Sequence, residues 1–126
     1  MTIAYLCLVF AFVLPVLIAG YAKATGGFRP RDNRNPREFM AGIKGGALRA
    51  RWAEQNTYEA LPAFFAAVIV AHQLQAPQAT VDALAVAFIV LRLVYVALYV
   101  ADKPALRSLV WMGGLGCTIA LAVIGF

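Results

Sequence analysis

The fold of this protein is decided where polar side chains run directly into an apolar segment. Residues 49–65 read RARWAEQNTYEALPAFF, and Gln55, Asn56 and Glu59 lie across the join between the two parts. As a helix, residues 60–74 would cover only about 22 Å, which is less than the ~30 Å of a bilayer's hydrocarbon core. If this helix crosses a membrane, its membrane part must begin near Gln55. A carboxylate and two amides would then lie within or at the edge of the membrane.

The composition supports a membrane location. Of the 126 residues, 63% are hydrophobic and only 13% are charged, which is more apolar material than a soluble core of this size can bury. We therefore predict one all-α integral membrane domain over residues 1–126, built as a four-transmembrane-helix bundle. The apolar stretches, each close to the roughly 20 residues needed for a crossing, are residues 3–22, 47–74, 81–101 and 105–126. The first has no cationic leader and is longer than a signal peptide's core, so it is expected to be a retained helix.

The positive charges are unevenly distributed. The formal net charge is +5, and eight of the 11 Lys and Arg residues fall within residues 23–51, whereas residues 73–82 contain none. By the positive-inside rule, the first and third connections face the cytoplasm and both termini lie on the other side. We expect the basic segment, interpreted as a loop ending at the Gly45–Gly46 pair, to contact membrane lipid rather than nucleic acid. In a prokaryote, this membrane would be the bacterial inner membrane.

Several residues with reactive or polar side chains have simpler explanations. Cys7 and Cys117 lie inside apolar stretches without metal-ligand spacing, so they are interpreted as packing residues, and neither a metal site nor a disulfide framework is expected. His72 has no second ligand nearby and is expected to be interfacial. Three aromatic residues near the predicted helix ends are expected to anchor the protein at the membrane surface: Tyr5, Tyr21 and Trp111.

Two polar stripes lie on the second and third predicted helices. Arg51, Gln55 and Glu59 are spaced four residues apart, and Asn56 shares their side of the helix. The second stripe has spacings of three, four and three: Arg92, Tyr95, Tyr99 and Asp102. Because neither stripe can comfortably face lipid, we expect them to face each other.

Glu59 and Arg92 lie at similar depths, about 15 Å from their cytoplasmic helix ends. We therefore predict that the two residues meet, directly or through a ligand, because a lone buried charge is costly and intramembrane charges are functional candidates. One alternative is that the pair only fixes the register of the helices. The surplus of amides, tyrosines and arginines favours instead a zwitterionic ligand with several carboxylates.

These motifs resemble those of the MAPEG family, the membrane-associated proteins in eicosanoid and glutathione metabolism. Residues 49–64 are similar to the family's second-helix signature Ala-x-x-Asn-x-x-Glu-x-x-Pro, matched by Ala53, Asn56, Glu59 and Pro62. RLVYVALY is similar to the third-helix motif, matched by Arg92, Tyr95 and Tyr99. Together with the four predicted helices and the basic first loop, the resemblance covers nearly the whole chain.

The resemblance implies a homotrimer that binds glutathione between neighbouring subunits near the cytoplasmic face. It assigns Arg51, Asn56, Glu59, Arg92 and Tyr95 to glutathione, and the two stripes add Gln55 and Tyr99. An arginine early in the fourth helix stabilises the thiolate in active members, and Arg107 is the residue here that could match it. Several members have an arginine four residues before the motif asparagine, a position that is Trp52 in this chain.

Three functions are compatible with these features. The leading hypothesis is a glutathione transferase or peroxidase, in which Arg107 stabilises the glutathione thiolate for attack on a lipophilic electrophile. Such help is needed because an ordinary cysteine thiol has a pKa near 8.5 and is only a few per cent thiolate at neutral pH. The second is a glutathione-binding or lipid-binding membrane protein without catalysis. The third, a small transporter subunit, is the weakest, because the outer helix halves, such as AAVIVA, are apolar.

Overall fold

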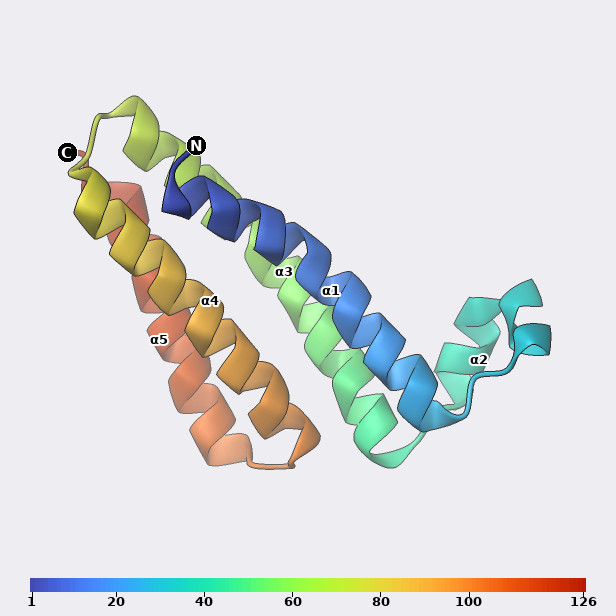
Figure 1. Ribbon diagram of the computed structural model, residues 1–126. Helices are drawn as coiled ribbons and strands as arrows, with labels where there is room; N and C mark the ends of the chain where they lie inside the picture. The colour runs from blue at the N-terminus through green and yellow to red at the C-terminus, as the bar shows by residue number, and fades with distance from the viewer.

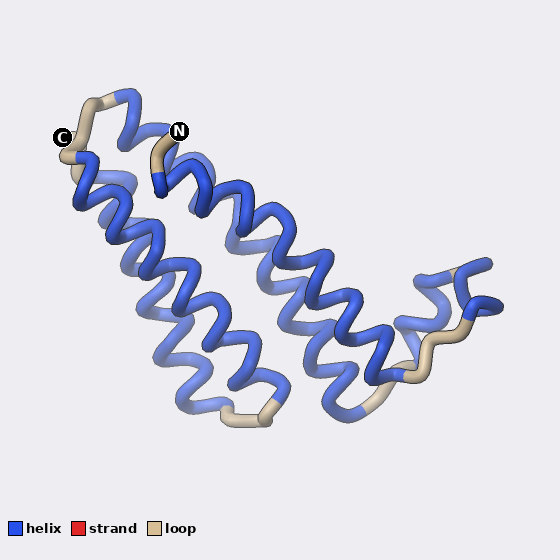
Figure 2. The backbone as a smooth tube through the Cα atoms, viewed as in Figure 1, coloured by secondary structure: helices blue, strands red, loops and turns tan.

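Four long helices run side by side and alternate in direction in the computed structural model, which describes residues 1–126 (Figures 1 and 2). The elements are α1 (Ile3–Gly26), the 3-10 helix η1 (Pro30–Arg34), α2 (Pro36–Gly42), α3 (Gly45–Gln73), α4 (Gln78–Val100) and α5 (Pro104–Val123). Both termini lie at one end of the bundle, and η1 and α2 project from the other end (Figure 1). That second end contains the basic segment and the α4–α5 turn, and we call it the basic end.

Local sequence signals explain where the helices begin and end. The Thr2 hydroxyl accepts a hydrogen bond from the Tyr5 amide at 3.2 Å and caps the start of α1. Gly27 ends α1 with a φ of 80°, a left-handed conformation that costs glycine little. Pro104 lies in the first turn of α5, where its missing backbone N–H would have no partner within the helix anyway. Because α1 has no stop signal before Gly27, it runs on to Gly26 instead of ending at residue 22.

The basic segment is more ordered than the predicted loop. It contains η1 and the seven-residue α2, so the chain has five α-helices where four were predicted. Asn35 caps α2, accepting a hydrogen bond from the Glu38 amide at 3.3 Å. A helix this short depends on packing for its stability. Met40 and Ile43 supply that packing, because both are buried in a cluster with residues of α1 and α3.

Three of the helices are long and apolar enough to cross a membrane: α1, α4 and α5, with mean hydropathies of 2.6, 2.4 and 1.6. α3 is longer, at 29 residues, but it is not among them. Its first half carries the polar residues discussed above, which lower its hydropathy. The composition therefore indicates three spans, one fewer than predicted.

The core nearest the termini is packed with aromatic and aliphatic side chains from α1, α3, α4 and α5. At its centre, the Phe64 and Phe88 rings stack with centroids 3.8 Å apart and an angle of 10° between their planes. Both side chains are almost completely buried. This buried, stacked pair packs α3 against α4 on the side of the polar residues that is nearer the termini.

Candidate functional site

Arg92 is the centre of the polar cluster. The residue is only 4% exposed, and its Nη2 donates to Asn56 Oδ1 at 2.8 Å and to Thr57 Oγ1 at 3.3 Å. Its guanidinium lies 4.1 Å from the centroid of the Tyr95 ring, a favourable cation–π distance. None of these groups is a carboxylate, so a buried positive charge is held by neutral partners alone. Its Nε is also buried and has no hydrogen-bond partner.

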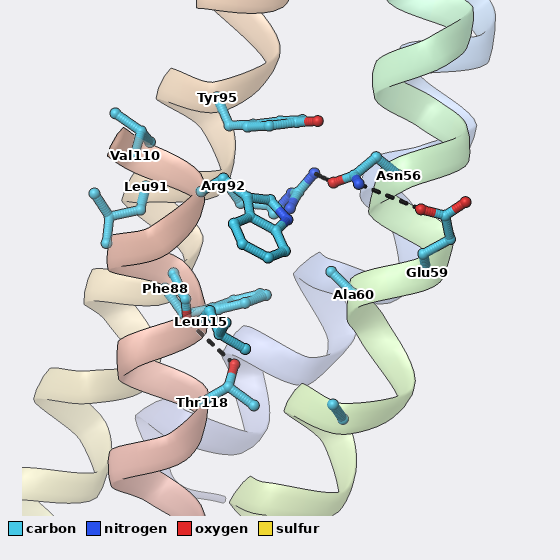
Figure 3. A pocket seen from close by; sticks show the side chains of 13 residues that line it. Asn56, Glu59, Ala60, Phe88, Leu91, Arg92, Tyr95, Val110, Leu115 and Thr118 are labelled. Atoms are coloured by element: carbon cyan, nitrogen blue, oxygen red, sulfur yellow. Dashed lines mark hydrogen bonds between the residues drawn. The ribbon is translucent and has the colours of Figure 1, made fainter. Parts of the chain in front are cut away.

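Glu59 and Arg92 do not contact each other directly. Asn56 lies between them: its Oδ1 accepts from Arg92, and its Nδ2 donates to Glu59 Oε2 at 3.3 Å (Figure 3). Of the two ways in which Glu59 and Arg92 were predicted to meet, the direct contact is not formed, and contact through a ligand stays a prediction. Asn56 occupies the position nearer α4, and the two ends of its amide connect a cation and a carboxylate that are too far apart to pair.

A line of aromatic rings connects Arg92 to Arg107. The Tyr95 and Tyr99 rings meet edge to face with centroids 5.6 Å apart. The Arg107 guanidinium lies 4.3 Å from the centroid of the Tyr99 ring. The α4–α5 turn thus returns the chain so that an arginine of α5 packs on a tyrosine of α4. Trp52, at the position where several family members have arginine, also lies near Tyr99, with the two ring centroids 6.4 Å apart.

Arg51 faces away from Arg92. Its Nη1 lies 2.9 Å from Glu54 Oε2, and both residues border an open groove formed by α1, α2 and α3. Gln55 and Glu59 form the edge between this groove and a second one that also includes Tyr95 and Tyr99. The two predicted stripes therefore face each other only in part. The reason is that side chains four residues apart drift around a straight helix, which turns about 100° per residue.

The far end of the second stripe lies outside the cluster. Asp102 is in the α4–α5 turn, exposed, with a φ of 58°. A different residue fixes this end of the bundle: Arg49 Nε donates to the Val100 carbonyl at 3.0 Å. That bond ties the start of α3 to the end of α4 and helps to align Asn56 with Arg92.

A cavity of about 190 Å³ extends inward from the cluster between α3, α4 and α5 (Figure 3). Asn56, Glu59 and Tyr95 line both this cavity and the open groove beside Tyr99, so the two hollows adjoin. Polar side chains border the end nearer the groove. The rest of the wall is mainly apolar.

The sequence interpretation missed three residues of this region. Thr57 is the second acceptor for Arg92, and its only signal was its position next to Asn56. Trp111, which is expected to anchor the protein at the membrane surface, also lines the cavity together with Gly114. Neither carried a sequence signal, because only the approach of α5 to α3 brings them to the site.

The match to a known family decides the identification. The model of the MAPEG family matches residues 1–126, the whole chain. The chain belongs to the MAPEG family. Together with its three apolar helices, this makes it a multi-pass membrane protein. No significant match to the MAPEG-family chain was found among the curated proteins or the solved structures.

Proposed function

We propose that this MAPEG-family protein is a glutathione-dependent membrane transferase or peroxidase. The observation that carries the proposal is the buried Arg92, whose side-chain contacts are all neutral. A buried charge without a counter-ion is costly. An anionic ligand that enters the cluster would supply the missing charge, and Arg binds carboxylates well.

The neighbouring groups suit glutathione, a tripeptide with two carboxylates, an ammonium group and a thiol. Arg92 lines the cavity beside the open groove at Tyr99, where its guanidinium could bind one carboxylate. Glu59 is exposed at the junction of the grooves, where its carboxylate could hold the ammonium group. Gln55, Tyr95 and Tyr99 border the same groove and could supply further hydrogen bonds.

The size of the site supports a ligand held partly outside one subunit. The cavity of about 190 Å³ is below the ~300 to 1,000 Å³ of typical ligand pockets, so the tripeptide must also occupy the open groove of about 430 Å³ beside Tyr99. That groove has no outer wall in a single chain. A neighbouring subunit would supply the wall, in keeping with a homotrimer, and would bring a second groove, the one lined by Arg51, against the ligand.

The proposed membrane placement follows from the charges. Ten of the 11 Lys and Arg residues lie at the basic end or in the segment leading to it, with Arg92 the exception. This asymmetry favours a cytoplasmic basic end and termini on the opposite side. α3 lies alongside α1 (Figures 1 and 2), so α3 would form a fourth span with Asn56 and Glu59 at the cytoplasmic edge.

Arg107 is the proposed catalytic residue. Its guanidinium lies 4.3 Å from the centroid of the Tyr99 ring, and Tyr99 lines the groove. A fixed positive charge beside the glutathione thiol would lower the pKa of that thiol. Each unit of that shift corresponds to about 1.4 kcal/mol of preferential stabilisation of the thiolate. The thiolate sulfur would then form the new bond to an electrophile that enters from the lipid, and the leaving group would depart with the electron pair.

A glutathione titration of the detergent-purified protein, followed by thiolate absorbance in the ultraviolet, tests this proposal. Arg107→Ala should abolish the saturable absorbance while retaining much of the glutathione binding. Lys103→Ala, which removes an exposed cation from the same turn, is the matched control and should behave as the wild type. Binding without thiolate in the wild type would favour the non-catalytic function. No binding would leave the cluster as a helix-joining network.

A further inference from the structure

The segment between α1 and α3 forms an arm that extends sideways from the bundle. We define the arm as residues 28–44, which contain η1 and α2. Figures 1 and 2 show it standing to the side of α1 rather than continuing the line of that helix. Because α1 is long and apolar enough to cross a membrane, an element that extends sideways from its end lies along the membrane surface. The arm is therefore close to the lipid headgroups, whichever leaflet the basic end faces.

The arm is held in a fixed position at its base. Met40 and Ile43 are 9% and 7% exposed, and both pack in one cluster with residues of α1 and α3. The Phe28 and Phe39 rings meet edge to face with centroids 4.9 Å apart, which joins the start of the arm to α2. The arm is thus an ordered element, and its outward side chains project from a fixed backbone.

The exposed arginines of the arm have no counter-ion. The chain forms a single ion pair, and that pair is between Arg51 and Glu54, outside the arm. The arm contains five cations and two acids, for a formal net charge of +3. Four of the cations are exposed, unpaired arginines: Arg29, Arg31, Arg34 and Arg37.

The two carboxylates of the arm are used in local hydrogen bonds. Asp32 Oδ2 accepts from the backbone amide of Arg29 at 2.7 Å, at the start of η1. Glu38 Oε2 accepts from the side-chain amide of Asn35 at 3.3 Å, at the start of α2. Both acids therefore stabilise the short helices of the arm, and the guanidinium groups stay free to bind an anion from outside the chain.

We propose that the arm binds the headgroups of anionic phospholipids through these unpaired arginines. Arginine binds phosphate oxygens in a bidentate manner, and each Lys or Arg near an anionic membrane surface strengthens binding about fivefold. Headgroups fit the arm better than a nucleic acid or an acidic protein does, because they surround a membrane-spanning chain permanently at a high local concentration. The sequence indicates only lipid contact, whereas the structure identifies the arginines that are free to make it. The proposal goes beyond the glutathione function and does not depend on it.

Native mass spectrometry of the detergent-purified protein can compare its affinity for two lipids with the same acyl chains. The probes are phosphatidylglycerol, which is anionic, and phosphatidylcholine, which is zwitterionic. Phosphatidylglycerol should bind the wild type at least about tenfold more tightly. The double variant Arg31→Gln/Arg34→Gln should weaken phosphatidylglycerol binding by at least about tenfold, whereas Arg31→Lys/Arg34→Lys keeps both charges and should retain most of it. The replaced side chains are exposed and unpaired, so circular dichroism should show both variants folded.

Two single substitutions locate the binding on the arm. Arg34→Gln and Lys103→Gln each remove one exposed cation at the basic end, but Lys103 lies in the α4–α5 turn, outside the arm. Arg34→Gln should weaken phosphatidylglycerol binding about fivefold. Lys103→Gln is the matched control and should leave that binding unchanged.

Equal affinity of the wild type for the two lipids would overturn the proposal. The same conclusion would follow if Arg31→Gln/Arg34→Gln kept the wild-type preference, because the lipid would then bind elsewhere. A short DNA duplex that bound more tightly than phosphatidylglycerol, with the same dependence on Arg31 and Arg34, would identify a nucleic-acid surface instead. Failure here is distinguishable from failure of the glutathione titration, because neither arginine lines the grooves assigned to glutathione.

Discussion

Asn56→Ala is the most informative single substitution in the polar cluster. It removes the 2.8 Å bond from Arg92 Nη2 to Asn56 Oδ1 and leaves that buried guanidinium with the 3.3 Å bond to Thr57 Oγ1 and the face of Tyr95. A hydrogen bond to a charged group contributes about 1.5 to 3 kcal/mol. Alanine is the better helix former by up to ~0.7 kcal/mol, which offsets part of the loss. We expect a net loss of about 1 to 2.5 kcal/mol in the free energy of unfolding.

The assay is SDS-induced unfolding in mixed micelles, followed by circular dichroism. Gln55→Ala is the matched control: the neighbouring amide is exposed and makes no hydrogen bond to another side chain, so its effect should stay within about 0.5 kcal/mol. A double-mutant cycle of Asn56→Ala with Arg92→Met should give a coupling energy of about 1.5 to 3 kcal/mol. A coupling energy near zero, or equal losses for Asn56→Ala and Gln55→Ala, would refute the reasoning.

Three further predictions address the helix ends and Arg107. Gly27→Ala, at a φ of 80°, should lower the free energy of unfolding by about 1 kcal/mol. Gly20→Ala, with nothing within 4 Å of the added Cβ, should instead raise the free energy of unfolding by up to about 1 kcal/mol. The same SDS titration compares the two variants. Thr2→Ala removes the cap of α1 and a 3.2 Å contact with His72, so amide hydrogen exchange should speed up in the first turn of α1, and unchanged exchange would exclude a capping role. Arg107→Lys keeps the charge but loses the flat guanidinium, so its thiolate absorbance should fall between those of the wild type and Arg107→Ala; a value equal to that of Arg107→Ala would show that charge alone is insufficient.

The helical and membrane character of this protein could be predicted from residue types and their order. An apolar segment that crosses a membrane must satisfy its backbone hydrogen bonds within itself, and among single segments only an α-helix does so. The family motifs around Asn56 and Arg92 are likewise local strings of residues. The ordered α2 was missed because its stability comes from Met40 and the adjacent Ile43, which pack on residues distant in sequence.

The contacts within the candidate site were decided by tertiary structure. Helical spacing places Arg51, Gln55 and Glu59 on one side of α3, but it does not say which of them α4 will approach. Packing rotates α3 so that Asn56, and not Glu59, contacts Arg92, and it leaves Arg51 with Glu54. In the same way, the cavity beside Arg92 exists only because α5 packs beside α3 and α4. The sequence by itself determined which chemical groups lie at the basic end of each helix, because that depends only on the order of the residues and on the rise per residue along the helix axis. The tertiary structure decided which of them touch, because rotation and tilt depend on side chains packed against other helices.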